Sequence, residues 1–469
     1  MKKTGHPAID KPANRYGKVV WFIGFTTLVV ICTALSTAAL VRHSLLGGTR
    51  LTSNQNEWIE RFAYLPSIGY RALRQLTHSG ESLLTLNKAI VEKPYWIRRF
   101  PAPEDPGYIL LSGLDSGQGA ANVRLLRVSD GEQMAIWNPD WSRIQRQSSE
   151  RKWAPKGSGQ ADRAFHPVLL EDGDIIFNTS YSLVRLGACE TQPKWILDQT
   201  AHHSVALSED NKSVWVPSIA ETAFSENPWL HERVRDDSLL EVSLQGQALR
   251  QISFSKILKE NGLETLLLGT GGPALNRDPI HINQISVAKH RGRHWERGDL
   301  LISARHMSTI FLYRPSTGKI IWHKQGPWMS QHAALFVDDH RISILNNNII
   351  AWAPTQNAFV RPGEINHVQI YDFDTDMVSE PFAAMLEISR PATISEGRAE
   401  LLPDGGLFFE ESNYGRLLRF GPNGLMWSFI NDLDSKHIGA LSWSRYLTPE
   451  EIHAPLASIA KRGNCLKKK

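Results

Sequence analysis

The sequence predicts an all-β protein, a six-bladed β-propeller preceded by an N-terminal transmembrane helix and a short helical juxtamembrane segment. Three observations carry this prediction: a 23-residue uncharged run near the N-terminus, short apolar runs separated by turn residues from Pro101 onward, and a recurring strand–turn–strand unit that often ends in Trp. Units of roughly 50 residues with about four strands each are typical of propeller blades.

The uncharged run Val19–Val41 is long enough to cross a bilayer as a helix. Residues 1–18 contain five Lys or Arg and one Asp, so we expect the N-terminus to stay in the cytoplasm and the body to be exported. Small residues at Ser36–Ala39 leave a cleaved signal peptide as the alternative, but signal-peptide cores usually have about 7–15 residues. We therefore predict an uncleaved inner-membrane anchor with a periplasmic main domain.

The charge of the chain lies in its two tails. The net charge is +4, yet residues 1–18 alone carry +4 and residues 461–469 carry +5, which leaves the body mildly acidic. This distribution argues against nucleic-acid binding. Of the three cysteines, Cys32 lies in the anchor, and a bridge between Cys189 and Cys465 stays open, because export would permit it. No cysteine spacing suggests structural zinc.

Composition shifts divide the chain into segments. Apolar residues near a three-to-four spacing in Glu57–Tyr64 and Tyr70–Leu76 indicate helix before Pro101. The predicted segments are a basic cytoplasmic tail (1–18), the transmembrane helix (19–41), the juxtamembrane segment (42–100), the propeller (101–455) and a basic C-terminal tail (456–469).

Four strand–turn–strand units are clear and two more are suggested. Each contains an Asp-Gly or similar turn and two or more strand-like runs, which together would give about six blades. A pair of β-sandwiches is the rival architecture, but the regular spacing of the units favours the propeller. The units begin near Tyr108, Asp172, Ser213, Gly298, Ile342 and Pro403.

Histidines and one arginine lie in or beside strand-like runs of different units. The inner strands of a propeller end at a shared funnel, so His203, His281, Arg305 and His332 could meet there. A buried Arg needs an anion or a carboxylate partner, and no carboxylate or cysteine motif accompanies the series. An anionic group in transfer would suit it. A structural role remains open for His281 and is favoured for His202 taken alone; His306, His323, His340 and His367 are interpreted as structural.

The series His203, His281-x-Asn283, Ser303-x-Arg305, Gly318–Trp322 and Gln331-His332 resembles the bacterial arylsulfotransferase family over roughly residues 165–430. The resemblance implies a six-bladed propeller with its active site on the funnel floor. It also implies transfer of sulfuryl groups between phenolic esters through a sulfated histidine, outside the cytoplasm, without a nucleotide donor.

By this resemblance, His332 matches the nucleophile, His281 and Arg305 match the sulfate-binding pair, and His203 matches the remaining site histidine. His202, Asn283 and Gln331 are the predicted substrate-binding residues. Family members commonly have an acidic residue after the His-His and Gln-His pairs, where this chain has Ser204 and Ala333.

The resulting hypothesis is a membrane-anchored, extracytoplasmic arylsulfotransferase without metal or cofactor, acting on an aryl sulfate donor and a phenolic acceptor. The competing hypothesis is a non-catalytic propeller of the same lineage that serves as a binding or scaffold module. A His-ligated metallohydrolase is disfavoured because no Asp or Glu motif stands beside the histidines. No signature of a quinone-cofactor dehydrogenase is present. Oligomeric state stays open.

Overall fold

The chain forms two units, one of residues 1–80 with 272–274 and one of residues 81–271 with 275–469. The computed structural model describes part of each. The described residues are 15–45, Thr52, Gln55, Trp58, Ile59, 85–115, 120–148, 163–179, 182–220, 234–268, 278–349, 351–353, 358–360 and 363–462.

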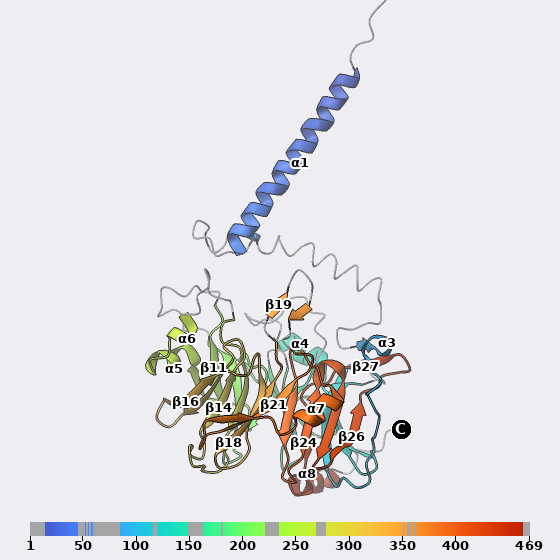
Figure 1. Cartoon of the computed structure of the whole chain (residues 1–469), viewed down its shortest axis with the longest axis vertical. Coiled ribbons are helices and arrows are strands. Elements are labelled where there is room, and N and C mark those ends of the chain that lie inside the picture. Colours follow the sequence, from blue (N-terminus) through green and yellow to red (C-terminus); the bar gives the residue numbers. More distant parts are fainter. Residues whose placement is uncertain are drawn as a thin grey trace, which may run out of the picture. The chain divides into compact units, whose positions relative to one another are not determined.

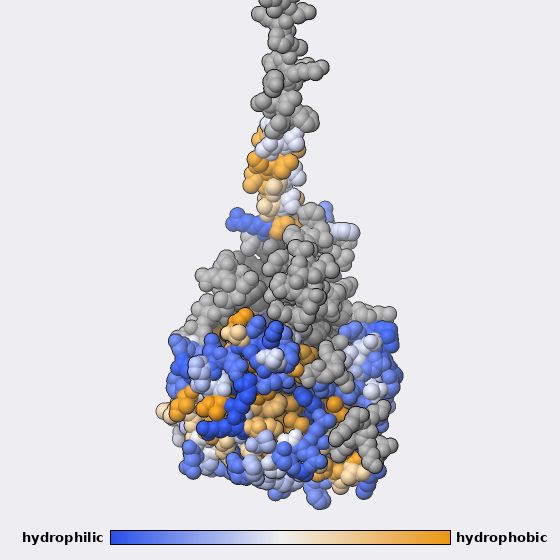
Figure 2. All heavy atoms as spheres, turned by 90° about the vertical axis from the view of Figure 1, so that its right-hand side faces the viewer, coloured by the Kyte–Doolittle hydropathy of each residue, from blue (hydrophilic) through white to orange (hydrophobic). Residues whose placement is uncertain are grey.

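The first unit contains helix α1 (Arg15–Leu45). Its segment Gly24–His43 is long and apolar enough to cross a membrane, and Figure 2 shows the described part of the helix as predominantly hydrophobic. The chain therefore has an N-terminal apolar helix of the kind found in signal sequences and in membrane anchors. Most of the predicted juxtamembrane segment 42–100 lies outside the described residues.

The second unit is a six-bladed β-propeller, as the sequence predicts. Its blades are four-stranded antiparallel sheets, and Figure 1 shows several of their strands side by side. In order from the inner to the outer strand, they are blade 1, β28 (Arg445–Leu447), β2 (Tyr108–Leu114), β3 (Ala121–Arg127) and β4 (Gln133–Trp137); blade 2, β5 (Phe165–Leu169), β6 (Ile175–Asn178), β7 (Leu183–Leu186) and β8 (Trp195–Ile196); and blade 3, β9 (Ala206–Leu207), β10 (Ser213–Ile219), β11 (Asp237–Ser243) and β12 (Ala248–Ser253).

The remaining blades follow the same pattern. They are blade 4, β13 (Ile282–Val287), β14 (Leu300–Ala304), β15 (Thr309–Arg314) and β16 (Lys319–Gln325); blade 5, β17 (His332–Phe336), β18 (Arg341–Asn346), β21 (His367–Asp372) and β22 (Met377–Ser379); and blade 6, β23 (Arg398–Leu401), β24 (Leu407–Glu411), β25 (Arg416–Gly421) and β26 (Gly424–Ile430). The six units noted in the sequence correspond to these six blades.

Short elements decorate the blades. Two-stranded pairings join β1 (Thr85–Asn87) to β27 (His437–Gly439) and β19 (Ala351–Ala353) to β20 (Ala358–Val360). The helices of this unit are α3 (Lys88–Val91), α4 (Trp141–Ser148), α5 (Phe254–Glu260), α6 (Thr265–Leu268), α7 (Ala383–Ser389), α8 (Pro449–Lys461) and the 3₁₀ turn η2 (Ser412–Tyr414). Helix α8 includes residues 456–461, which the sequence analysis assigns to the tail.

The C-terminal strand closes the ring. Strand β28 is the inner strand of blade 1 and pairs antiparallel with β2, with Tyr108 opposite Leu447 and Leu110 opposite Arg445. Blade 1 is therefore built from both ends of the propeller sequence. Closure of this kind protects the edge strand that an open ring would expose.

A hydrophobic cluster fills each interface between neighbouring blades. Residues of β3 and β6 meet between blades 1 and 2, for example, and residues of β11 and β14 meet between blades 3 and 4. The other four interfaces are filled in the same way. Trp137 and Trp427 are fully buried in these clusters, so these two repeat tryptophans are part of the blade core. The rigid ring fixes where each inner strand begins.

Two of the three cysteines are among the described residues, and they differ in oxidation state. Cys189, after β7, takes part in a disulfide, whereas Cys32 in α1 is a free thiol. Cys465 lies outside the described residues.

Candidate active site

The inner strands of the six blades begin around the propeller axis, and a residue with positive φ lies at each of these starts. Five of them are not glycine, and four of these are His or Trp. A non-glycine residue in this region costs of order 1–3 kcal/mol, and such outliers cluster at functional sites. The six residues are His166 (49°), His203 (55°), His281 (55°), Ala333 (45°), Gly397 (126°) and Trp443 (60°).

Three of these strand starts are also irregular in register. The pairing shifts between Phe165 and Val168, between Ile282 and Gln284, and between His332 and Leu335. A bulge of this kind breaks the alternation of a strand and re-aims a side chain. The sequence-predicted histidines therefore owe their placement to local backbone distortions at the axis.

His203 and His281 lie edge to face, with ring centroids 4.9 Å apart. Behind His203, the Nδ1 atoms of His202 and His203 are 2.7 Å apart, and Arg235 donates to Nε2 of His202 at 2.7 Å. The same Nε2 atom lies 3.3 Å from the carbonyl oxygen of Ser218. The contact with His202 engages Nδ1 of His203, so Nε2 is the ring nitrogen of His203 that a ligand can contact.

His281 has a carboxylate partner. Its Nδ1 donates to Oδ2 of Asp278 at 2.5 Å, and the same carboxylate lies 3.5 Å from Arg235. The other face of the imidazole stacks on the exposed ring of His306, with centroids 4.2 Å apart. In this arrangement Nδ1 of His281 donates to a carboxylate, and Nε2 carries a lone pair. A histidine that acts as an acid or a base usually has this form.

Arg305 follows the inner end of β14, and its backbone N–H donates to the carbonyl of His281 at 3.0 Å. Among the described residues, its Nε has no hydrogen-bond partner although it is buried. Burial lowers the pKa of Arg305, and the charge of Asp278 opposes that shift. A buried guanidinium without a bound carboxylate calls for an anion.

His332 is the first residue of β17 and is buried. Its Nδ1 lies 2.6 Å from Oδ1 of Asn347, and the Asn347 amide nitrogen donates to the carbonyls of Thr393 and Glu396. Those two bonds orient the amide, so its oxygen faces His332 and accepts the proton of Nδ1. His332 is thereby fixed in the tautomer with a free lone pair on Nε2.

The histidines of the cluster are neutral. Burial lowers the pKa of His332 to about 3, and the charges of Arg305 and His306 contribute. The pKa values of His203 and His281 are also held well below the usual range, first by burial and then by neighbouring His and Arg groups. Uncharged imidazoles beside a buried Arg form a site that accepts an anion and offers a nitrogen nucleophile.

The structure thus brings together His203, His281, Arg305 and His332, while the three predicted substrate-binding residues lie one layer behind. His202 is buried and bonded to His203. The amide of Asn283 donates to the carbonyl of Gln331 at 2.7 Å, and the Gln331 amide donates to Ser303, Ala304 and Thr309 of blade 4. These contacts hold the strand starts in place.

The residues at the two positions where an acid was expected have structural roles. Ser204 accepts a hydrogen bond from the backbone of Ile285 at 2.8 Å, and Ala333 is buried in the left-handed region. The sequence-based statement that no carboxylate lies near the series is wrong, because Asp278 contacts His281 and Asp237 lies 3.6 Å from His202. Asp278 stands three residues before His281 in the same segment, whereas Asp237 comes from β11 of blade 3.

Sequence reasoning missed several residues of this cluster. His166 is buried, and its ring stacks on Trp443 with centroids 4.4 Å apart. Burial holds the pKa of His166 well below its usual range. Its place just before an Asp-Gly turn, like that of His203 before Ser208–Asn211, was a usable signal. Asn347 stood in the run Asn346–Asn348 after an apolar strand, a weaker one.

Of the three groups of described side chains whose geometry could hold a metal, one lies in this cluster. Ligand atoms of Asp278, His281 and His306 lie within 4.8 Å of one another. Two guanidiniums oppose a cation there, because Arg235 is 3.5 Å from Asp278 and the Arg305 charge acts on His281. The electrostatics therefore favour an anion over a metal ion.

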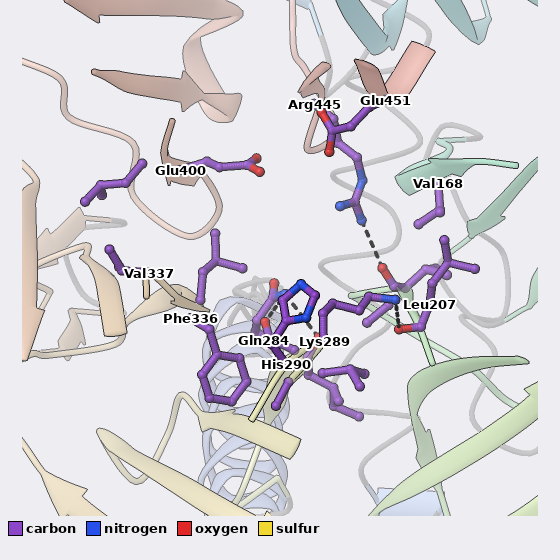
Figure 3. Close-up of a pocket in the computed structure, with 18 of the residues that line it drawn as sticks. Val168, Leu207, Gln284, Lys289, His290, Phe336, Val337, Glu400, Arg445 and Glu451 are labelled. Carbon is purple, nitrogen blue, oxygen red and sulfur yellow. Dashed lines mark hydrogen bonds between the residues drawn. The ribbon is translucent and has the colours of Figure 1, made fainter. Parts of the chain in front are cut away.

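A cavity of about 760 Å³ lies at the other end of the axis. It is lined by the later residues of the inner strands and by Glu451 and Pro455 of α8, and Figure 3 shows Arg445, Glu400 and Lys289 around it. None of the four clustered residues lines this cavity. The histidine cluster, and not this cavity, has the groups that chemistry requires.

A family model described as arylsulfotransferase (ASST) matches residues 166–432, more than half of the chain. No curated protein matches the chain. Solved structures with a similar arrangement include a protein of unknown function from Bacteroides caccae (13% identity, 73% of this chain, 99% of that chain, TM-score 0.45). The Pan2 WD40 domain of Neurospora crassa (9%, 73%, 82%, 0.37) and a streptogramin B lyase (10%, 75%, 87%, 0.33) are further examples. TM-scores of this size carry no argument about function.

Proposed function

The chain belongs to the arylsulfotransferase family, and on that premise we propose that its propeller moves a sulfuryl group from a phenolic sulfate ester to a phenolic acceptor. His332 is the covalent carrier. The observation that carries this proposal is the 2.6 Å bond from His332 Nδ1 to Asn347 Oδ1, because it leaves a nucleophilic Nε2 beside Arg305. The proposal involves no cofactor.

In the first half-reaction the Nε2 lone pair of His332 forms a bond to sulfur. The bond between sulfur and the aryl oxygen breaks, and its electrons leave with the phenolate. The sulfated ring keeps the proton on Nδ1, which still donates to Oδ1 of Asn347. The positive charge of the imidazolium therefore balances the negative charge of the sulfonate. The acceptor then runs the same steps in reverse, which gives ping-pong kinetics.

Arg305 would bind the sulfate oxygens. Sulfuryl transfer resembles phosphoryl transfer, with a loose transition state and charge spread over the equatorial oxygens, so positioning and electrostatic stabilisation dominate. A planar guanidinium offers two parallel donors to such oxygens. The unpartnered Nε of Arg305 supports this role, because a bound anion would satisfy it.

His281 would protonate the departing phenolate. It is neutral without substrate, because burial and the Arg charges hold its pKa down. An arriving sulfate ester is negative and would offset those charges, so it would raise the pKa of His281 while Asp278 stabilises the imidazolium. His203 would contact an oxygen of the same ester through Nε2, because its ring lies 4.9 Å from that of His281 and its Nδ1 is engaged by His202.

We further propose that α1 anchors the enzyme in the inner membrane with the propeller in the periplasm. The apolar segment Gly24–His43 and its basic N-terminal flank support this orientation. An extracytoplasmic reporter enzyme fused after residue 60 is expected to be active. A strong signal from a cytoplasmic reporter at the same site would reverse the orientation.

The test of function uses the full-length protein in detergent. Incubation with 4-nitrophenyl sulfate and no acceptor should give a sulfuryl adduct by intact-mass analysis, which peptide mapping should place on His332. Addition of phenol should discharge the adduct and yield phenyl sulfate. His332→Ala should abolish both the adduct and the transfer.

The matched control is His367→Gln. His367 is another propeller histidine, but its Nδ1 bonds Glu380 near the outer strand of blade 5. This variant should keep the adduct and the turnover. If the wild-type protein gives no adduct and no turnover over a panel of phenolic sulfates, the catalytic proposal fails and the binding-module hypothesis is favoured.

A further inference from the structure

The floor beneath His332 is made of two stacked rings. Trp443 lies with its ring centroid 6.4 Å from that of His332 and 4.4 Å from that of His166. Phe165 packs edge to face against the indole at 5.4 Å. Both Trp443 and His166 are almost fully buried. Trp443 is thus in reach of the nucleophile on one side and of His166 on the other.

The cavity of about 760 Å³ described above, called the lower cavity from here on, is lined by residues close to this pair in the chain. Its lining includes Val168, two residues after His166, and Arg445, two residues after Trp443. Each ring of the pair therefore lies two positions along the chain from a residue of the cavity wall. The pKa of His166 is lowered first by burial and then by the charges of Arg398 and Arg445, and both arginines line the cavity. The stacked pair therefore contacts His332 on one side and stands two residues from the cavity lining on the other.

The backbone holds the pair in place. The N–H groups of Trp443 and Ser444 donate to the two carboxylate oxygens of Glu410 at 2.6 and 2.5 Å. The N–H of His166 donates to the carbonyl of Ser442 at 3.1 Å. Among the described residues, neither ring nitrogen of His166 has a hydrogen-bond partner. Trp443 is therefore fixed by a buried carboxylate, and His166 is held against it by its backbone bond and by ring stacking.

We infer that the stacked pair of His166 and Trp443 closes the axial channel beneath His332 and sets the ratio of sulfuryl transfer to hydrolysis. This inference rests on the proposed function. The lower cavity is lined by exposed residues such as Glu171, His290 and Arg291, so it is open to water. A phenolic acceptor would cover the cluster from the funnel, and the pair would exclude water from below.

The competing reaction is simple to state. Water attacks the sulfur of sulfated His332, an oxygen–sulfur bond forms, and the sulfur–nitrogen bond breaks. The electron pair returns to Nε2, and the products are neutral histidine, sulfate and two protons released to solvent. In transfer, the acceptor hydroxyl replaces water and keeps the sulfuryl group. Access of water to sulfur therefore decides the partition.

The test measures inorganic sulfate against phenyl sulfate, with 4-nitrophenyl sulfate as donor and phenol as acceptor, in ¹⁸O-enriched water. Trp443→Ala should raise the ratio of labelled sulfate to phenyl sulfate about tenfold, which corresponds to about 1.4 kcal/mol between the two barriers. Trp443→Phe keeps an aromatic ring there and should stay near the wild-type ratio. Val168→Ala enlarges the cavity without opening the floor and should leave the ratio unchanged.

A second variant protects the test against a folding failure of Trp443→Ala. His166→Ala opens the floor from the other ring and should also raise the ratio. It should shorten the lifetime of the preformed sulfated enzyme without acceptor. An unchanged ratio in a folded variant that still releases nitrophenol would overturn the inference. Absence of nitrophenol release from the wild-type protein would instead overturn the proposed function.

Discussion

Replacement of Asn347 by Leu tests the orientation of the nucleophile most directly. The side chains are similar in size, so the change removes the amide while it largely keeps the volume. Nδ1 of His332 loses its acceptor, and the carbonyl of Glu396 loses the amide donor. The carbonyl of Thr393 keeps a second donor, the amide of Asn366 at 2.8 Å. The perturbation is thus concentrated on His332.

The magnitude follows from the lost bond. A buried donor left without an acceptor costs about 1–3 kcal/mol. His332 can escape that cost by moving its proton to Nε2, which removes the lone pair that attacks sulfur. Reaction then requires the disfavoured tautomer, so kcat should fall by about 10–100-fold, since 1.4 kcal/mol is tenfold. The KM for the donor should change little, because Arg305 remains.

The assay is donor cleavage by stopped-flow absorbance, with the formation rate of the sulfated enzyme as the primary readout. Thermal unfolding of the same sample separates catalysis from stability. Asn347→Asp serves as the contrast, because it keeps an acceptor facing Nδ1 and should retain more activity than the Leu variant. A folded Asn347→Leu protein with the wild-type rate of adduct formation would refute the assignment of Asn347 as the orienting residue.

Three other predictions follow from the same site. Arg305→Lys should lower kcat/KM by about 10²–10³, because a point charge cannot replace a planar fork; steady-state kinetics with an aryl sulfate would contradict this if the loss were below threefold. Stability should fall as the pH drops below about 6.5, because buried His166 and His332 have lowered pKa values, so the unfolded chain binds more protons there. The slope is about 1.4 kcal/mol per pH unit for each histidine, and urea titrations from pH 7.5 to 5 should show it reduced in His166→Ala. Ser204→Asp should destabilise the propeller by about 1–3 kcal/mol, because it removes the hydroxyl that accepts from Ile285 and buries a charge; an unchanged urea midpoint would contradict that.

The fold was predictable because each blade repeats local signals. An apolar run, an Asp-Gly or similar turn and a second run mark β6 and β7 as clearly as β24 and β25. Because this pattern recurs along the chain, it indicates a repeat architecture. Strand β28 was less visible, since Arg445–Leu447 is three residues long and its partner lies at the far end of the propeller sequence. Nothing local indicates that pairing.

The site was predictable only in part, and for a physical reason. His203, His281, Arg305 and His332 stand in recognisable local patterns, whereas their partners are chosen by register. His332 lies opposite Leu345, so Asn347 reaches it only because β17 and β18 pair in that register beside a bulge. Asp278 contacts His281 through a short local turn, and its proximity in sequence was undervalued. His166 joins the cluster by stacking on Trp443, which stands just before β28, the strand that closes the propeller. No local sequence pattern indicates this long-range contact.

The closure of blade 1 also has a consequence for synthesis. Tyr446 donates to Asp105 across 341 positions of the chain, and β2 gains its inner neighbour only when Arg445–Leu447 arrives. During synthesis from the N-terminus, the nascent propeller therefore presents the bare edge of β2 until nearly the whole polypeptide has been made. Exposed strand edges recruit other strands. The rate of synthesis and the chaperones that meet the growing chain are accordingly expected to govern yield more than the stability of any finished blade does.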